Sequence, residues 1–115
     1  MKKLSENTCE ACRVGAPLIT DEERKALLPQ IPEWQTRVID GVEQLHRTYT
    51  FANFVKAMAF ANRVGDIAEA EGHHPAIVVE WGKVQVRWWT HKINGLHKND
   101  AIMAAKTDDI FSAGN

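Results

Sequence analysis

The sequence predicts an α+β fold, a four-stranded antiparallel sheet built from two hairpins with three helices packed on one face. Two turn signals, Asp40-Gly41 and Gly82-Lys83, each separate two runs rich in β-branched and aromatic residues, which is the pattern of a β-hairpin with a tight turn. Three segments with a helical spacing of apolar residues surround these hairpins. The predicted order of elements is therefore α-β-β-α-β-β-α.

The first helix is predicted from Asp21 to Leu28. Thr20 and Glu23 have the spacing of a capping box, in which each side chain accepts a hydrogen bond from the main chain of the other. Pro29 and Pro32 follow, and proline cannot continue a helix. This helix is expected to be short.

The first hairpin is predicted to join strands at residues 34–39 and 42–51. Asp-Gly between them is a strong signal for a type I′ turn. Apolar and polar residues alternate along both strands, so one face should be covered and the other open to water. His46 falls on the open face as an ordinary solvated residue. The face expected to be covered carries Trp34, Thr36, Val38, Leu45 and Tyr49.

The middle helix is predicted from its cap, Asn53, to about Glu71. Its apolar residues recur at spacings of three and four, and Val55 and Met58 extend the apolar surface further around the helix. A helix that is apolar over most of its circumference is covered on two sides, which predicts contact with another subunit. Gly65 lies within this helix and suggests a close approach of another element there.

The second hairpin is predicted at residues 76–89, with its turn at Gly82-Lys83. In that register Trp81 faces Val84, and Trp81 is expected to pack in the core. The face expected to be covered carries Ile77, Val79, Trp81, Val84, Val86 and Trp88.

Extending this register beyond the strands places His74 opposite His91. Directly opposed residues on antiparallel strands lie about 4.5–5.5 Å apart. His73 is adjacent, at the bend where Gly72 suits the end of the middle helix and Pro75 prevents its continuation. The sequence thus predicts that three histidines gather at one rim of the sheet.

The final helix is predicted from about Lys98 to Phe111. Asp100 falls at its third position if His97 is the cap, where a carboxylate satisfies free amide groups and suits the helix dipole. The residues expected on its buried side are Ala101, Ile102, Ala105 and Ile110.

The composition predicts one ordinary globular domain. The chain has 115 residues, 14 Lys and Arg against 15 Asp and Glu, and a net charge of -1. This balance gives no basic field for nucleic acid and no acidic tail for a basic partner. No apolar run approaches the ~18–20 residues that span a bilayer. The N-terminus begins basic but lacks the apolar core of a signal peptide, so we expect a cytoplasmic protein.

Residues 1–19 are predicted to form a mobile N-terminal arm before a single domain at residues 20–115. Cys9 and Cys12, the only cysteines, lie in this arm. Their spacing suggests a zinc or redox site, but zinc needs about four ligands and no second pair completes them. We expect reduced thiols, with a metal clip shared between subunits or a redox role as alternatives.

Three clustered imidazoles permit two chemistries. They can bind zinc or another divalent metal and leave one position for water, or they can move protons, because histidine titrates nearest neutrality. Adjacent strand residues such as His73 and His74 point to opposite faces, which disfavours one tetrahedral metal shell. Crowded imidazolium groups would need a neighbouring carboxylate such as Glu69. Proton transfer is therefore the favoured reading, with metal binding as the alternative.

A set of residues at fixed intervals resembles a known signature: Glu69, His73-His74-Pro75, Trp81, Thr90-His91, Gly95-Leu96 and Asp100. In these residues the sequence is similar to the pterin-4a-carbinolamine dehydratase family. The resemblance spans about residues 20–111. It departs from the family at His97, where a Ser or Thr cap is common. The arm with the two cysteines lies outside the signature.

The resemblance implies dehydration of 4a-hydroxytetrahydropterin to quinonoid dihydropterin, without a metal or an organic cofactor. This elimination needs an acid that protonates the departing C4a hydroxyl and a base that takes the N5 proton. By resemblance, His73 and His91 are the expected acid and base, and His74 holds the substrate and can share the proton transfer. The residues expected to bind or orient the substrate are Glu69, Pro75, Thr90 and Asp100.

The resemblance also implies partners. Members of this family assemble as dimers and tetramers, so a homodimer or homotetramer is expected. Such an enzyme would serve a pterin-dependent aromatic amino acid hydroxylase, and neither nucleic acid nor a membrane is expected as a partner. Two alternatives to the enzyme remain, a non-catalytic dimerisation or interaction module and a histidine-cluster metal site.

Overall fold

The computed structural model describes residues 4–7, 9 and 16–114 of the chain. Its α-helices are α1 (Asp21–Leu27), α2 (Phe54–Glu71) and α3 (Lys98–Gly114). Its strands are β1 (Gln35–Ile39), β2 (Val42–Thr50), β3 (Ala76–Glu80) and β4 (Lys83–Trp88). Short 3₁₀ turns are η1 (Leu4–Glu6), η2 (Leu28–Gln30) and η3 (His91–Ile93). The predicted order of helices and strands is confirmed.

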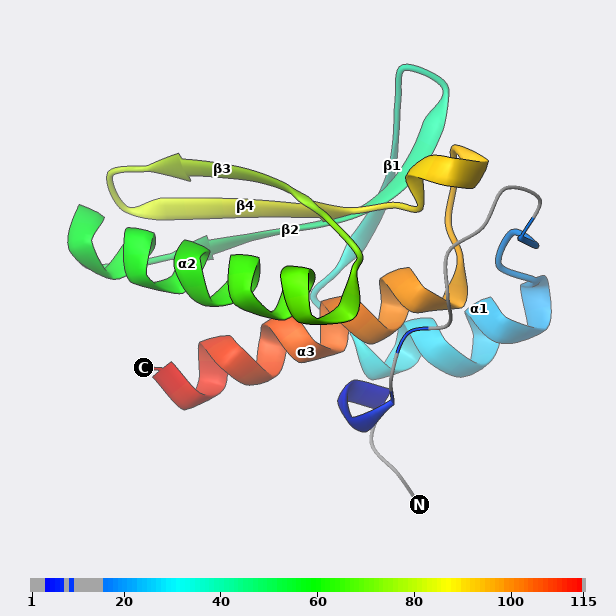
Figure 1. The fold of residues 1–115 in the computed structure, drawn as a ribbon, viewed down its shortest axis with the longest axis horizontal. Helices are drawn as coiled ribbons and strands as arrows, with labels where there is room; N and C mark the ends of the chain where they lie inside the picture. Colours follow the sequence, from blue (N-terminus) through cyan, green and yellow to red (C-terminus); the bar gives the residue numbers. More distant parts are fainter. Residues whose placement is uncertain (1–3, 8, 10–15, 115) are drawn as a thin grey trace.

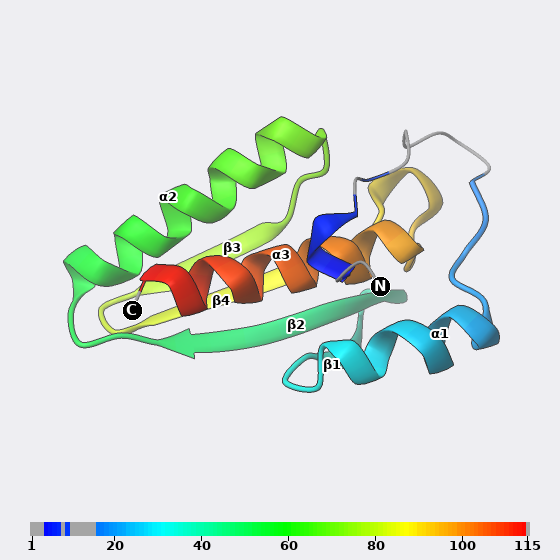
Figure 2. The same cartoon turned by 90° about the horizontal axis from the view of Figure 1, so that it is seen from below.

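The strands form one antiparallel sheet in the order β1-β2-β4-β3, so the two hairpins join through β2 and β4. The three helices lie on one face of this sheet (Figures 1 and 2). The predicted α+β class, with helices on one face, is therefore confirmed. Within the described part of the chain, no helix combines the length and the apolar character needed to cross a bilayer.

The hydrophobic core fills the space between the sheet and helices α2 and α3. Burying one large aliphatic or aromatic side chain contributes about 1.5–3 kcal/mol, so the facing residues of these layers are the main source of stability. The buried residues include Leu45, Tyr49, Val84, Val86 and Trp88 from the strands, Ala57, Phe60 and Val64 from α2, and Ala101 and Met103 from α3.

The local signals at the first helix and hairpin act as predicted. The Thr20 hydroxyl accepts from the Glu23 amide at 3.1 Å, and the Glu23 carboxylate accepts from the Thr20 amide at 2.9 Å, which completes the capping box. Asp40 and Gly41 have φ of 51° and 78°, as a type I′ turn requires. These short-range contacts fix where α1 begins and how β1 meets β2.

A polar cluster ties the sheet to α3. One carboxylate oxygen of Asp108 accepts hydrogen bonds from Trp34 Nε1 at 2.9 Å, Arg47 Nη1 at 2.7 Å and the Tyr49 hydroxyl at 2.5 Å. Burial, and then the bond to this carboxylate, hold the pKa of the Tyr49 hydroxyl well above its ordinary 10.0. Tyr49 therefore remains a donor, and the cluster sets how α3 lies against β2.

The second hairpin differs from the prediction in register. Val79 lies opposite Val84 rather than opposite Val86, so the turn is Trp81-Gly82 and not Gly82-Lys83. The predicted register was wrong by two residues. Because side chains alternate with a period of two, this shift leaves each strand residue on its predicted face.

The altered turn changes the position of Trp81. Its side chain is 70% exposed at the turn, so the prediction that it packs in the core was wrong. The main chain of the turn lies against the end of β2, because the Phe51 amide donates to the Gly82 carbonyl at 2.8 Å. A Cβ at Gly82 would lie 3.0 Å from the Phe51 carbonyl oxygen. This close approach explains a glycine at the second turn position.

Helix α2 has one buried and one exposed apolar side. Asn53 caps it by accepting from the Lys56 amide at 2.9 Å, as predicted. Phe54, Val55 and Met58 are 46%, 77% and 37% exposed. A Cβ at Gly65 would meet no neighbouring atom within 4 Å, so the close approach predicted there is not found among the described residues.

Described residues of the N-terminal segment contact the domain. Leu4 is 5% exposed and belongs to the core, and the Ser5 carbonyl accepts from Lys106 Nζ of α3 at 2.8 Å. The Cys9 amide donates to the Glu71 carboxylate at 2.8 Å. Cys12 lies outside the described residues. The mobility of the arm and the roles of both cysteines stay predictions.

Candidate active site

The end of α2 positions the first histidine. Gly72 has φ of 64° and its amide donates to the Glu69 carbonyl, while the His73 amide donates to the Ala68 carbonyl at 3.0 Å. These two bonds form a Schellman motif, which needs a residue with positive φ and suits glycine. The motif turns the chain sharply and directs His73 back toward the sheet.

His73 lies at the floor of the site and is 3% exposed. Its ring stacks on Trp88 of β4 with a centroid distance of 5.7 Å and an interplanar angle of 5°. Its Nε2 lies 2.6 Å from a carboxylate oxygen of Asp100. An ionised carboxylate can only accept, so this contact places a proton on Nε2, and the lone pair of the neutral ring then lies on Nδ1.

Asp100 is completely buried, at 0% exposed. Its second oxygen accepts from the Thr90 hydroxyl and from the His97 amide, both at 2.9 Å. His97 in turn caps α3, because its Nδ1 accepts from the Asn99 amide at 3.0 Å. The start of α3 is therefore a reciprocal cap with histidine in the serine or threonine place, and it delivers Asp100 to His73.

The other two histidines lie at the rim. His74 is mostly exposed, and its Nε2 lies 3.3 Å from the Glu69 carboxylate. His91 Nε2 lies 3.1 Å from the main-chain oxygen of His74, and its ring packs on Trp89 at 4.3 Å between centroids. A carbonyl oxygen only accepts, so His91 donates from Nε2 and a neutral ring has its lone pair on Nδ1.

Continued past the strand ends, the observed register would pair His74 with Trp89 instead of His91. His91 nevertheless reaches His74, because β4 is followed at once by the η3 turn, and a Thr90–Gly95 bridge folds the loop back. The predicted meeting of these histidines is found, but through the turn rather than through a continuous ladder.

The three histidines line one pocket of about 260 Å³. Within the described part of the chain, its lining residues are Gly72, His73, His74, Thr90, His91 and Lys92. The pocket lies at the C-terminal end of α2, where that helix passes into β3, next to the turn after β4. Imidazoles at its floor and its rim can exchange protons with a bound molecule from two sides.

The residues expected to bind substrate take different places around this pocket. Thr90 lines it, although its hydroxyl is directed to Asp100. The Glu69 side chain is 83% exposed and its carboxylate faces His74. Pro75 follows His74 but is not a lining residue, and Asp100 lies behind His73. Glu69 and Asp100 therefore contact histidines rather than the cavity itself.

Sequence reasoning did not identify three residues of the site. Lys92 lines the pocket, and its position directly after His91 could have indicated it. Trp88 stacks on His73, and Trp89 packs against His91 at a tilt of 36°. Their aromatic character alone predicted packing in a strand. Contact with the imidazoles arises from the bend before β3, which places His73, and the turn after β4, which places His91.

Among the described residues, no three or more His, Cys, Asp or Glu side chains are grouped so that they could hold a metal ion. His73 directs Nε2 at Asp100, and His91 directs Nε2 at a main-chain carbonyl. Each of these nitrogens therefore faces an acceptor within the protein.

Comparison with known families agrees with this geometry. Residues 17–110 match the family model described as "Pterin 4 alpha carbinolamine dehydratase". The chain belongs to this family. Curated relatives in Syntrophotalea carbinolica and Marinobacter nauticus are 66% and 60% identical over 111 residues, covering 96% of this chain and 99% and 100% of theirs. Both are named "Putative pterin-4-alpha-carbinolamine dehydratase". Membership supports a dehydratase, which is a hydro-lyase.

Solved structures share the dehydratase fold. A transcriptional coactivator/pterin dehydratase from Brucella melitensis has a TM-score of 0.72 and 31% identity, covering 82% of this chain and 98% of its own. A pterin dehydratase-like protein, described as a RuBisCO assembly factor in the alpha-carboxysome, has a TM-score of 0.58 and 19% identity over 68% of this chain and 88% of its own. The second likeness concerns the fold alone.

Proposed function

We propose that this carbinolamine dehydratase removes water from 4a-hydroxytetrahydropterin by histidine acid–base catalysis, as a step of pterin cofactor recycling in the cytoplasm. The single observation that supports this most strongly is the shared pocket of His73, His74 and His91. Family membership supplies the reaction class, and the pocket supplies two imidazoles at different depths.

In the proposed reaction the base takes the N5 proton, the C4a–O bond breaks, and the electron pair of the N–H bond forms the C4a=N5 double bond. The acid protonates the departing hydroxyl, which leaves as water. We assign the base to His73, because the buried Asp100 carboxylate at 2.6 Å would compensate the positive charge that His73 gains. His91 at the rim is the acid, and His74 holds the substrate.

The direct test is an assay with a synthetic 4a-carbinolamine, whose spontaneous loss of water provides the blank. We expect the protein to accelerate the reaction, and His73→Ala and His91→Ala each to remove most of the acceleration, because general acid or base catalysis contributes about 10²–10⁴-fold. His46→Ala is the matched control, since it removes a histidine outside the pocket. Wild-type rates equal to the blank would refute the proposal.

The two alternatives give different results in companion measurements. A metal site predicts stoichiometric zinc after purification without chelator, and loss of activity on chelation. An interaction module predicts a stable oligomer that accelerates nothing and captures a partner, with a pterin-dependent hydroxylase as the first to test. Elemental analysis and the carbinolamine assay together separate all three.

A further inference from the structure

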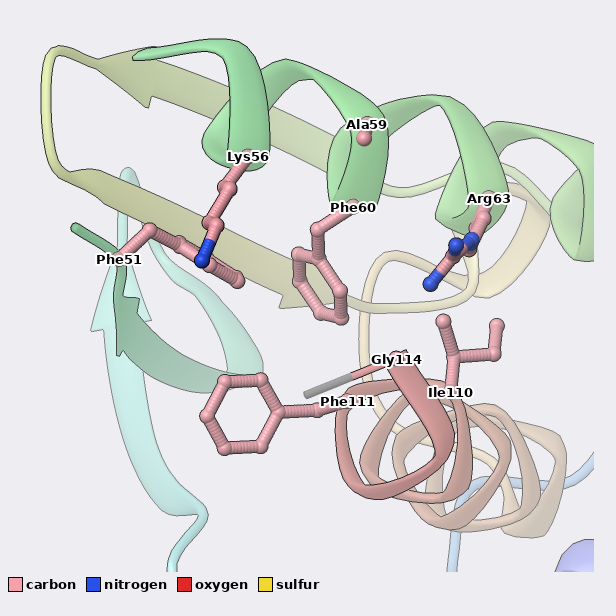
Figure 3. A pocket seen from close by; sticks show the side chains of 8 residues that line it. All are labelled: Phe51, Lys56, Ala59, Phe60, Arg63, Ile110, Phe111 and Gly114. Atoms are coloured by element: carbon pink, nitrogen blue, oxygen red, sulfur yellow. The ribbon is translucent and has the colours of Figure 1, made fainter. Parts of the chain in front are cut away.

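A second pocket, of about 290 Å³, lies at the other end of α2, beside the C-terminal end of α3. Figure 3 shows side chains from both helices directed into it. Lys56, at this pocket, lies sixteen positions before Gly72 at the histidines, and Arg63 lies nine positions before it. At about 1.5 Å per residue, Lys56 and Arg63 are about 24 Å and about 14 Å from Gly72 along the helix. The pocket is therefore separate from the proposed catalytic site.

Aromatic side chains form one wall of this pocket. Phe51, Phe60 and Phe111 contact one another, with ring centroids 5.2–5.9 Å apart. Such a surface accepts another ring in a stacked or edge-on arrangement. A cavity of about 150 Å³ holds benzene, so a pocket of about 290 Å³ has room for a fused bicyclic ring or a substituted single ring.

The rim of the pocket is positively charged. Lys56 and Arg63 of α2 both extend toward it (Figure 3), and no lining residue is acidic. Within the described chain, neither side chain takes part in an ion pair with a carboxylate. Among the described residues, the pocket therefore combines an aromatic wall with two cations that have no carboxylate partner.

The helix ends decide where a negative charge would lie. The Arg63 guanidinium lies next to Gly114, where a Cβ would overlap Arg63 Nη1. Gly114 is at the C-terminal end of α3, so the positive charge of Arg63 is stabilised by the negative end of that helix dipole. Lys56 instead lies in the first turn of α2, which contains no acidic residue. The dipole of α2 is positive there. The unbalanced positive charge is consequently at the Lys56 end.

We propose that this pocket binds a small aromatic monocarboxylate. Its ring lies against Phe51, Phe60 and Phe111, and its carboxylate pairs with Lys56 at the start of α2. This inference goes beyond the dehydratase reaction and does not depend on it, because it uses none of the histidine-pocket residues.

The test is a titration of the ¹⁵N-labelled protein with 2-naphthoate, followed by amide chemical shifts. For a drug-like ligand of this size, a Kd of about 1 mM or tighter is expected. Saturable shifts should centre on Ala59, Phe60 and Phe111. Shifts that do not saturate, or that centre on His74 and His91, would overturn the proposal.

Three comparisons test the chemistry of the site. Ala59→Leu places a larger side chain in the pocket on a helix position that tolerates leucine, and binding should be lost. Lys56→Gln, and 2-naphthamide in place of 2-naphthoate, should each weaken binding about threefold or more. Lys25→Gln on α1 is the matched control and should leave the Kd unchanged. Unchanged binding in Ala59→Leu or Lys56→Gln, or equal affinity for the amide, would contradict the assignment.

Discussion

The carboxylate of Asp100 receives hydrogen bonds from three separate segments, through the His73 ring, the Thr90 hydroxyl and the His97 amide. A buried carboxylate is tolerated only when its oxygens are paired in this way. One oxygen of Asp100 accepts from Thr90 and His97, and the other faces His73. A single residue therefore connects the start of α3 with the proposed base. In the proposed reaction, this carboxylate would position His73 and compensate the positive charge that His73 gains.

Replacing Asp100 with Asn should therefore reduce activity more than it reduces substrate binding. The amide keeps the shape but lacks the negative charge and one acceptor, so we expect kcat to fall about 10²-fold or more with KM little changed. The free energy of unfolding should fall by about 1–3 kcal/mol. Steady-state kinetics and urea unfolding measure both effects. Asp109→Asn, on the exposed side of α3, is the control, and a kcat within about twofold of wild type in Asp100→Asn would contradict the role.

His46, on the uncovered sheet face, should make the fold sensitive to acid. Partial burial, and then the charges of Arg37 and Arg87, lower its pKa below the ordinary 6.5. A histidine with a lowered folded pKa supports the fold above the unfolded pKa, and this support is lost as the pH falls through the folded value. His46→Gln should therefore reduce the difference in urea midpoint between pH 8 and pH 5. An unchanged difference would show that His46 is not involved.

At the scale of elements, the structure explains how a histidine can cap α3 at a position where Ser or Thr was expected to be common. His97 takes part in both hydrogen bonds of this reciprocal cap, since its ring accepts from the Asn99 amide and its own amide donates to the Asp100 carboxylate. Only a neutral imidazole can accept at Nδ1. The ring thus does the work of the usual serine or threonine hydroxyl.

His97→Ala should destabilise the fold by about 0.5–2 kcal/mol, the usual effect of removing a helix cap. His97→Ser should recover most of that loss, because its hydroxyl can accept the same amide hydrogen bond. Urea unfolding of the three proteins measures the series. If the serine variant were as unstable as the alanine variant, the ring would stabilise the fold through packing and not through the cap.

The hairpins show how far element-level prediction reaches. Asp40-Gly41 could be predicted because both residues adopt positive φ, and that requirement is visible in their chemistry. The Trp81-Gly82 turn could not be predicted in this way. Its glycine is favoured by the close approach of the Phe51 main chain, which follows β2 and is distant in the sequence. The alternation of apolar and polar residues has a period of two, so it cannot distinguish two strand registers that differ by two residues. Trp81 was therefore assigned to the wrong position.

The same limit applies to the site. The position of His73 and His74 at the bend followed from a helix end and a proline, which are local features. The approach of His91 was predicted from a hairpin register that was wrong, and it comes about through the η3 turn. That His73 is buried on Asp100 while Glu69 stays exposed depends on how α3 packs against β4. Such packing is a tertiary property that spacing does not encode.

At the scale of the whole molecule, the exposed apolar side of α2 remains to be explained. Phe54, Val55 and Met58 lie together near the start of the helix, at 46%, 77% and 37% exposed. Exposed apolar side chains grouped on one element are typical of an interface. We infer that they take part in the homodimer or homotetramer that the resemblance to the dehydratase family implies.

Val55→Glu should consequently dissociate the oligomer, because a closed symmetric interface repeats the charge on every subunit and buries it without a partner. Light scattering coupled to size exclusion should report a smaller assembly for this variant than for wild type. Val38→Glu is the control, since Val38 is 67% exposed at the tip of the first hairpin, away from α2. A wild-type monomer, or an unchanged mass in Val55→Glu, would show that this face of α2 is not the interface.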